Sequence, residues 1–132
     1  MQELLRYVGP SLHATLRMTR EPVEIDGTLI PPGEIVLVLL SAANRDPAQY
    51  PSPGRLDIGR DAAGHLSFGH GIPYCLGAPL ATMEAEIAIA GLLTRFPEMT
   101  LAVAPTKLRW RPSTLVHGPV PLPVRLRRPA EN

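Results

Sequence analysis

Prolines constrain the fold of this chain more than any other residue type. The sequence contains 16 of them in 132 residues, and many gather in three clusters, at residues 31–32, 47–53 and 119–123. Each proline fixes its own φ angle, lacks a backbone N–H and interrupts helices and inner strands. The clusters therefore separate the expected elements and do not form a low-complexity tract. Between Pro79 and Pro97 there is no proline, and residues 80–95 are expected to form a long helix.

Shorter elements are expected on both sides of this helix. The dipeptide Asp26-Gly27 is a strong two-residue turn signal, and it predicts a hairpin between residues 23–25 and 28–30. Residues 34–40 are almost wholly apolar and predict a strand that needs cover on both faces. The remaining predictions are a helix end at 2–7, a short helix or turn at 41–46, an irregular segment at 51–64, and short strands at 101–103, 108–111, 115–117 and 120–126.

The overall composition is that of an ordinary globular protein and excludes several classes. A net charge of +1 argues against an electrostatic nucleic-acid binder, and no apolar run approaches the length of a membrane span. The first residues are charged early and short in apolar residues, so no signal peptide is expected in them. The single cysteine excludes an internal disulfide, so a reducing compartment, the cytoplasm, is expected.

That cysteine, Cys75, lies in the glycine-rich segment 68–77, directly before the long expected helix. Closely spaced glycines let the backbone turn sharply and come close to a flat ligand. A sulfur at a helix N-terminus lies near free N–H groups and the positive end of the helix dipole, which favour the metal-binding thiolate. The alternative is a buried structural cysteine.

The segment 68–77 resembles the haem-ligand loop of the cytochrome P-450 family, whose pattern is Phe-Gly-x-Gly-x-His/Arg-x-Cys-x-Gly. The matching residues are Phe68, Gly69, Gly71, Cys75 and Gly77. The resemblance implies that the Cys75 thiolate is the axial ligand of the iron in haem b. Thiolate ligation pushes electron density onto iron and favours O–O cleavage, the chemistry of a monooxygenase.

Two further features bear on how haem would be held. The helix after the loop is rich in small residues such as Ala81, which permit close approach to a flat partner. The family often has an arginine at the position of Arg17 that pairs with a haem propionate, and His13 and Arg20 are weaker candidates for this role. The sequence departs from the pattern at Pro73, where the family supplies a basic residue and proline offers no N–H.

A carboxylate and a guanidinium lie three residues apart at Glu3 and Arg6, on one face of the expected helix end. Such a pair is usually a solvated surface pair of little energetic value. The family, however, carries a Glu-x-x-Arg pair at this distance before its haem loop, joined by an arginine from the irregular segment. The resemblance therefore implies a buried cluster of Glu3, Arg6 and Arg55 that fixes the irregular segment behind the haem.

The resemblance covers the whole chain, residues 1–132, but only the C-terminal part of the family fold. The family is mainly α with small β-sheets (α+β). The chain is expected to be a partial fold with a helix end, a β hairpin, an irregular meander, the haem loop, a long helix and a β-rich tail. The helices that form the oxygen-binding face and most of the substrate pocket are expected to be missing, as in a truncated reading frame, a gene fragment or a piece of a longer protein.

The resemblance implies a bacterial-type monooxygenase that inserts one oxygen atom from dioxygen into a small organic substrate. A ferredoxin-type partner and its NAD(P)H reductase would supply electrons, with no nucleic acid or membrane involved. Residues 12–16 and 115–119 fall where the family lines its substrate pocket, although core packing explains their apolar character equally well.

The isolated chain is not expected to be active as a monooxygenase. Two alternatives to this function remain. One is a non-catalytic haem-binding remnant. The other is a haem-free thiol enzyme, in which His65 or His70 would act as the base for Cys75.

Overall fold

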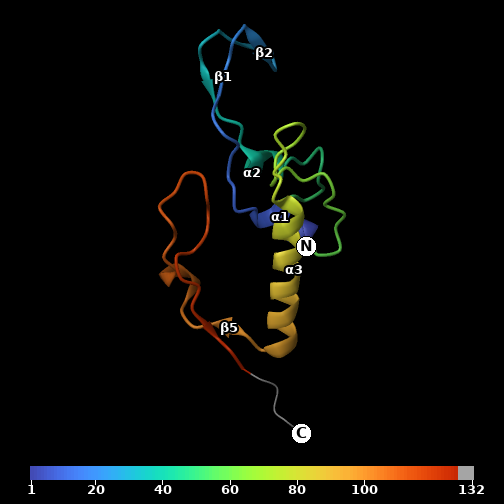
Figure 1. Cartoon of the computed structure of the whole chain (residues 1–132), viewed down its shortest axis with the longest axis vertical. Coiled ribbons are helices and arrows are strands. Elements are labelled where there is room, and N and C mark those ends of the chain that lie inside the picture. Colours follow the sequence, from blue (N-terminus) through green and yellow to red (C-terminus); the bar gives the residue numbers. More distant parts are fainter. Residues whose placement is uncertain (128–132) are drawn as a thin grey trace.

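The computed structural model describes residues 1–127, so residues 128–132 of the predicted unit lie outside the described part. Its longest element is helix α3, and the other elements lie above it and to one side of it (Figure 1). The elements are α1 (Gln2–Val8), β1 (Arg17–Met18), β2 (Val23–Ile25), β3 (Thr28–Ile30), β4 (Ile35–Val36), α2 (Leu40–Ala43), α3 (Ala78–Arg95), β5 (Thr100–Leu101), the 3₁₀-helix η1 (Pro105–Lys107) and β6 (Val124–Arg125).

Helix α3 confirms the long helix predicted between two prolines. It begins after Gly77 with Pro79 in its first turn, where a missing N–H costs nothing because the first N–H groups of a helix have no partner inside it. At the other end the N–H of Phe96 donates to the carbonyl of Leu92 at 2.8 Å, and Pro97 follows. The proline positions therefore set both ends of this helix.

The predicted hairpin is also confirmed. Strands β2 and β3 pair antiparallel, with Val23 opposite Ile30 and Ile25 opposite Thr28. Both turn residues have positive φ, 48° at Asp26 and 73° at Gly27, as the tight turn between twisted strands requires. Two more antiparallel pairs, β1 with β4 and β5 with β6, complete the sheet structure of the described residues.

The prediction of one apolar strand over residues 34–40 is wrong. Only Ile35 and Val36 pair with another strand, because β1 offers only two residues as partners. Leu40 instead begins α2, where it is buried. The apolar side chains of residues 37–39 are exposed, so the cover that this segment needs does not come from residues 1–127.

The β-rich tail is less regular than predicted. Of the expected strands only β5 and β6 form, each two residues long. The segments around Trp110 and Val116 make isolated bridges, to Pro119 and Ser11 respectively. Pro112, Pro119, Pro121 and Pro123 lie in this region, and because proline donates no backbone hydrogen bond, a continuous ladder cannot form.

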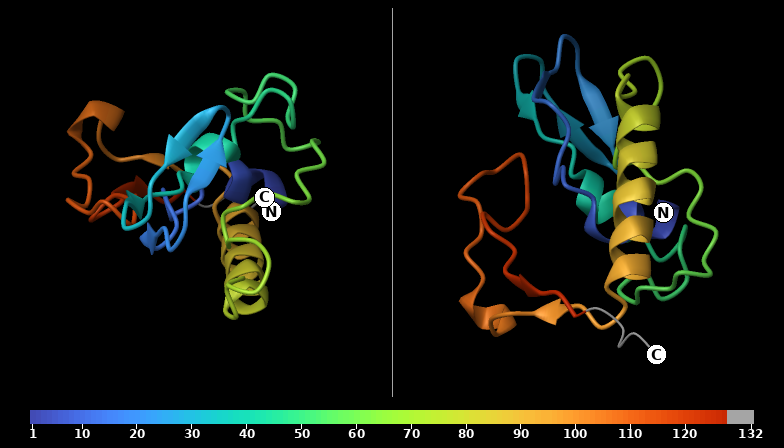
Figure 2. Two further views of the ribbon diagram at one scale, coloured as in Figure 1. Left: turned by 90° about the horizontal axis from the view of Figure 1, so that it is seen from above. Right: turned by 60° about the horizontal axis from the view of Figure 1, so that its bottom comes forward.

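The most buried part of the described chain is polar. Its buried apolar residues are Leu40, Tyr50, Ala62 and Ala78, and its buried polar residues are Glu3, Arg6, Asn44, His65 and Ser67. These polar residues belong to α1, to the segment after α2 and to the loop before α3, which meet near the middle of the molecule (Figure 2). Hydrogen bonds and ion pairs therefore hold these three segments together where an apolar core would normally do so.

Helix α3 exposes apolar side chains around most of its circumference, including Leu80, Met83, Ile87 and Leu93. A helix that is apolar all round is normally buried. No helix within residues 1–127 combines the length and the apolar character needed to cross a bilayer.

Candidate functional site

The segment before α3 forms a compact loop that closes on itself. The N–H of Cys75 donates to the carbonyl of Phe68 at 2.9 Å, and the N–H of Tyr74 donates to that of Gly71 at 3.1 Å. Gly69 and Gly71 have φ angles of 81° and 69°, a left-handed conformation that side-chain-bearing residues rarely adopt. The two glycines therefore make this turn possible, as the sequence pattern predicted.

Cys75 lies at the open face of this loop and is exposed. Its carbonyl accepts a hydrogen bond from the N–H of Ala78 at 3.1 Å, which joins the loop to the first turn of α3. Exposure contradicts the alternative of a buried structural cysteine. A side-chain carbon added to Gly77 would lie 3.7 Å from the sulfur, so the glycine keeps one side of the thiol open.

Exposed apolar residues lie close to Cys75 in the sequence. Ile72 and Leu76, on either side of Cys75 in the sequence, are both fully exposed. The ring of Phe68 lies 6.4 Å from that of Tyr74 in an edge-on arrangement and 5.9 Å from the ring of His65. The loop thus presents one sulfur between exposed apolar residues, and its two aromatic rings pack against each other.

The structure argues against a Cys–His catalytic pair. His65 is buried, and both ring nitrogens are engaged: Nε2 lies 2.7 Å from the Gln2 side-chain oxygen, and Nδ1 accepts the N–H of Ser67 at 3.2 Å. Burial lowers the pKa of His65 and so favours this neutral form. Within residues 1–127 no hydrogen bond joins Cys75 to His65 or His70.

The predicted pair of Glu3 and Arg6 is confirmed and buried. Arg6 Nε and Nη2 donate to the two carboxylate oxygens of Glu3 at 2.6 and 2.8 Å, the bidentate geometry that offsets the cost of burying both charges. The hydrogen bonds from Arg6 lower the pKa of Glu3 from 4.5 to about 2, although burial acts in the opposite direction. The rings of Tyr7 and Tyr50 flank the guanidinium, with its carbon 5.8 and 5.1 Å from their centres.

The prediction that Arg55 completes this cluster is wrong, because Arg60 takes that place. Arg60 Nε donates to Glu3 Oε1 at 3.3 Å, and its other nitrogens hold the carbonyls of Pro51 and Ser52. Arg55 is exposed and contributes only its backbone carbonyl, 3.5 Å from Arg6 Nη2. Both arginines lie in the irregular segment, and residue spacing alone could not decide which one turns inward.

The other two residues predicted to contact haem are Arg17 and Ala81. Arg17 begins β1 opposite Val36, and its side chain is exposed. Ala81 lies in the first turn of α3, where its N–H donates to the carbonyl of Gly77 at 2.9 Å. The propionate contact of Arg17 and the haem contact of Ala81 stay predictions.

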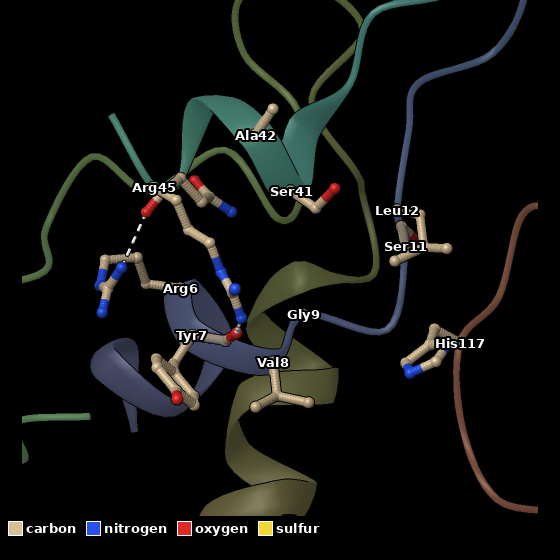
Figure 3. Close-up of a pocket in the computed structure, with 11 residues that line it drawn as sticks. Arg6, Tyr7, Val8, Gly9, Ser11, Leu12, Ser41, Ala42, Arg45 and His117 are labelled. Atoms are coloured by element: carbon tan, nitrogen blue, oxygen red, sulfur yellow. Dashed lines mark hydrogen bonds between the residues drawn. The ribbon is translucent and has the colours of Figure 1, made fainter. Parts of the chain in front are cut away.

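The two segments predicted to line a substrate pocket lie next to each other. The N–H of Leu12 donates to the carbonyl of Leu115 at 3.2 Å, and that of His117 to the carbonyl of Pro10 at 2.8 Å. Leu12 and His117 line a pocket of about 400 Å³ together with the end of α1 and with α2. Figure 3 shows this pocket, with Arg45 reaching from the end of α2 to the backbone carbonyl of Tyr7, 3.3 Å away.

The comparisons with known proteins agree on one family. The family model "Cytochrome P450" matches residues 1–120. Cytochrome P450 monooxygenase PikC of Streptomyces venezuelae is 52% identical over 131 residues, which cover 99% of this chain and 32% of that protein. The 6-deoxyerythronolide B hydroxylase of Saccharopolyspora erythraea is 48% identical over 126 residues, 96% of this chain and 31% of that protein.

Solved structures give the same result for the fold. The tirandamycin C-bound P450 monooxygenase TamI superimposes with a TM-score of 0.91 at 52% identity, covering 96% of this chain and 32% of that one. The P450 PksS of Bacillus subtilis 168 superimposes with a TM-score of 0.90 at 41% identity, with 96% and 33% covered. The few helices and small sheets of the chain are thus consistent with part of a P450 fold.

The chain spans about a third of the length of the curated relatives that it matches. Within that third the sequence match extends over nearly all of its residues, and the backbone follows that of solved P450 structures. The chain therefore belongs to the cytochrome P450 family.

Proposed function

We propose that this chain is the haem-ligand part of a bacterial cytochrome P450 monooxygenase, with the Cys75 thiolate as the axial ligand of haem b. The observation that carries the proposal is the exposed sulfur of Cys75 on a glycine-shaped loop at the N-terminus of α3. Membership of the P450 family and the match of residues 68–77 to its ligand-loop pattern support it.

The residues of the loop fit a large, flat, largely apolar metal complex. The thiol is accessible, and the side chains of Ile72 and Leu76 add exposed apolar surface in the same loop. No group of three or more His, Cys, Asp or Glu residues within residues 1–127 could hold a bare metal ion. A metal bound by a single protein sulfur needs a prosthetic group to supply its other ligands, as haem does.

Five residues of the loop then have a defined task. Cys75 supplies the sulfur, while Gly69, Gly71 and Gly77 let the backbone lie close to the macrocycle. Phe68 holds the N–H of Cys75 through its carbonyl, 2.9 Å away. When bound, haem supplies the chemistry of dioxygen activation, which the electron donation of a thiolate ligand favours.

Two more residues contribute to this proposed site. Ala81 would leave room for haem at the start of α3, and Arg17 would pair with a propionate. Burying an unpaired carboxylate is costly, so a propionate in a protein requires such a cation or a hydrogen-bond donor nearby.

We assign residues 1–132 to the C-terminal part of a P450 domain, and the activity to the whole enzyme. That enzyme would insert one oxygen atom of dioxygen into an organic substrate, with electrons from NAD(P)H through a ferredoxin-type partner. The names of its relatives include substrates as different as 6-deoxyerythronolide B and vitamin D(3), so no narrower substrate class is proposed.

The large exposed apolar surface favours a second candidate for the isolated chain, which is haem binding without catalysis. Dioxygen activation needs a dry pocket, and within residues 1–127 the face that carries Cys75 is open to solvent. We expect no monooxygenase turnover by the 132-residue chain alone.

A haem titration of the chain tests the proposal. Absorbance at the haem band should saturate at one haem per chain, and Cys75→Ser should weaken the affinity by at least tenfold because the variant lacks the thiolate. His70→Gln, which alters an exposed loop residue that is not the proposed ligand, should bind as the unaltered chain does. Equal affinity in Cys75→Ser and the unaltered chain would overturn the assignment.

A further inference from the structure

Asn44, directly after α2, connects the buried ion pair to the loop that carries Cys75. Its backbone carbonyl accepts a hydrogen bond from Arg6 Nη1 at 2.8 Å, so the Glu3–Arg6 pair holds its main chain. Its side-chain oxygen accepts the N–H of Leu66 at 2.6 Å, and its side-chain nitrogen donates to Ser67 Oγ at 2.9 Å. Only 3% of Asn44 is exposed.

Ser67 continues this connection to α1. Its hydroxyl donates to the carbonyl of Leu5 at 2.7 Å while accepting from Asn44. The carbonyl of Leu5 lies at the C-terminal end of α1, where helix carbonyls lack partners within the helix. One buried hydroxyl thus fixes the start of the Cys75 loop against α1 and the segment after α2 at once.

Gly9 makes this close approach possible. A side-chain carbon placed on Gly9 would lie 2.6 Å from Ser67 Oγ and 2.8 Å from the carbonyl oxygen of Leu5, closer than real atoms allow. The φ of Gly9 is −53°, which any residue can adopt. Glycine is therefore required here for space alone, to let Ser67 reach Leu5.

The connection extends to the cysteine through two backbone hydrogen bonds. Leu66, held by Asn44, accepts the N–H of Gly69 at 2.9 Å, and Phe68 accepts the N–H of Cys75 at 2.9 Å. A shift of residues 66 and 67 would therefore move the carbonyl of Phe68 and, with it, the main chain of Cys75.

We propose that Asn44 is a positioning residue for Cys75: its main chain is held by Arg6, and its side-chain amide fixes residues 66 and 67 of the loop. The importance of this role for haem rests on the proposed function. The role itself is a coupling between the side chain of Asn44 and the main chain of Cys75, which does not depend on haem. Asn44 touches neither the sulfur nor the face of the loop on which haem would lie, and acts through Leu66, Ser67 and Phe68.

Amide hydrogen exchange, measured residue by residue by NMR in the full 132-residue chain without haem, tests the coupling. Asn44→Ala removes two hydrogen bonds, so exchange at the amides of Leu66 and Cys75 should accelerate by on the order of tenfold. Amides in the middle of α3 should keep their protection. The control is Asp46→Ala, which removes an exposed hydrogen bond to the N–H of Ala48 in the same segment and should leave Cys75 unchanged.

Asn44→Asp and Ser67→Ala provide the test if Asn44→Ala does not fold. Asp keeps the acceptor for Leu66 but loses the donor to Ser67, and an intermediate acceleration at Cys75 is expected. Ser67→Ala keeps the Asn44–Leu66 bond and should still accelerate exchange at Cys75. Unchanged exchange at Cys75 in these variants, or equal acceleration throughout α3, would overturn the inference.

Haem spectra separate this inference from the proposed function. In the reduced carbon monoxide complex, Asn44→Asp should convert part of the thiolate-type Soret band into the blue-shifted band that lacks thiolate, while Asp46→Ala should not. If the unaltered chain takes up no haem but the exchange coupling is present, the proposed function fails and the positioning role stands. If haem binds through Cys75 but exchange at Cys75 does not respond, the positioning role fails alone.

Discussion

At the scale of single residues, the described chain is organised around Glu3. Its carboxylate accepts hydrogen bonds from Arg6, from Arg60 and from the N–H of Asp57 at 3.0 Å. Helix α1 and the irregular segment that contains Asp57 and Arg60, which are far apart in the sequence, thus converge on one buried charge. Removing one partner of such a cluster leaves an uncompensated buried charge, which costs more than the intact pair contributes.

Because Arg60 and not Arg55 donates its side chain to this cluster, substitutions of these two arginines should have different effects on stability. Arg60→Gln should lower the free energy of unfolding by about 1–3 kcal/mol, because it leaves part of Glu3 and the carbonyls of Pro51 and Ser52 without donors. Arg55→Gln should change it by less than about 0.5 kcal/mol, since that side chain is exposed. Urea unfolding measures both, and an equal or larger loss in Arg55→Gln would contradict the structure.

The buried ring of His65 predicts a pH-dependent stability. Because burial lowers the pKa of His65 in the folded state, the unfolded chain binds the proton more readily. Stability from this residue is complete above its unfolded pKa of about 6.5 and is lost as the pH falls below that value. Protonation of Nδ1 would also place a new N–H against the N–H of Ser67, which now donates to this nitrogen.

As the pH falls from about 7 to about 5, the free energy of unfolding should therefore decline more steeply for the unaltered chain than for His65→Asn. Asn retains an acceptor but does not titrate in this range. His70→Asn, at an exposed position, controls for the loss of a histidine. The loss of stability from Glu3, whose pKa is lowered to about 2, belongs to a separate window between about pH 4.5 and 2. A pH slope in His65→Asn equal to that of the unaltered chain would refute this role of His65.

At the scale of elements, the sequence correctly predicted the helix and the hairpin whose ends are set by residues within or beside them. The ends of α3 follow from Pro79 and Pro97, and the β2–β3 turn follows from Asp26-Gly27. The apolar run 34–40 failed as a predictor because a strand needs a partner, and β1 provides only two residues. Pairing between distant segments is not encoded in the run itself.

The site was predictable to a similar extent. The spacing of Gly69, Gly71 and Cys75 predicted a turn that presents a sulfur, and the structure contains it. The role of Asn44 left no signal in the sequence, because an asparagine between α2 and a proline cluster reads as a turn residue. Only the fold shows that its side chain faces the loop before α3.

Within the Cys75 loop, Pro73 predicts weak retention of haem. It lies in the exposed turn closed by Gly71 and Tyr74, where proline supplies neither charge nor N–H. Pro73→His should slow the loss of haem to an excess of apomyoglobin, because the new side chain can donate to a propionate. Pro73→Ala removes the proline without adding a donor and should not slow it. Equal rates of haem loss in Pro73→His and the unaltered chain would refute the prediction.

At the scale of the whole molecule, apolar surface is the dominant feature. Few apolar residues are buried within residues 1–127, whereas Ile87, Leu93 and many others are exposed along α3 and the tail. Contiguous apolar surface of this kind drives association in water. The polar centre around Glu3 and Asn44 holds the segments together but does not cover α3.

The isolated chain should therefore self-associate, and charges on α3 should reduce this. The double variant Ile87→Lys and Leu93→Lys removes apolar surface at two exposed positions and should shift size-exclusion elution toward the monomer, with helix content unchanged by circular dichroism. Thr94→Lys adds a charge at an exposed polar position and should have a smaller effect. If Thr94→Lys disperses the chain as well as the double variant does, net charge and not apolar surface controls the association.

The central claim is that the sulfur of Cys75 binds haem iron as a thiolate, and the carbon monoxide difference spectrum of the reduced, haem-loaded chain tests it most directly. We predict the red-shifted Soret band of a thiolate–carbonyl complex in the unaltered chain and its loss in Cys75→Ser, the chain's only cysteine having been removed. A spectrum without that band in soluble, haem-loaded protein, or the same band in Cys75→Ser, would contradict the account.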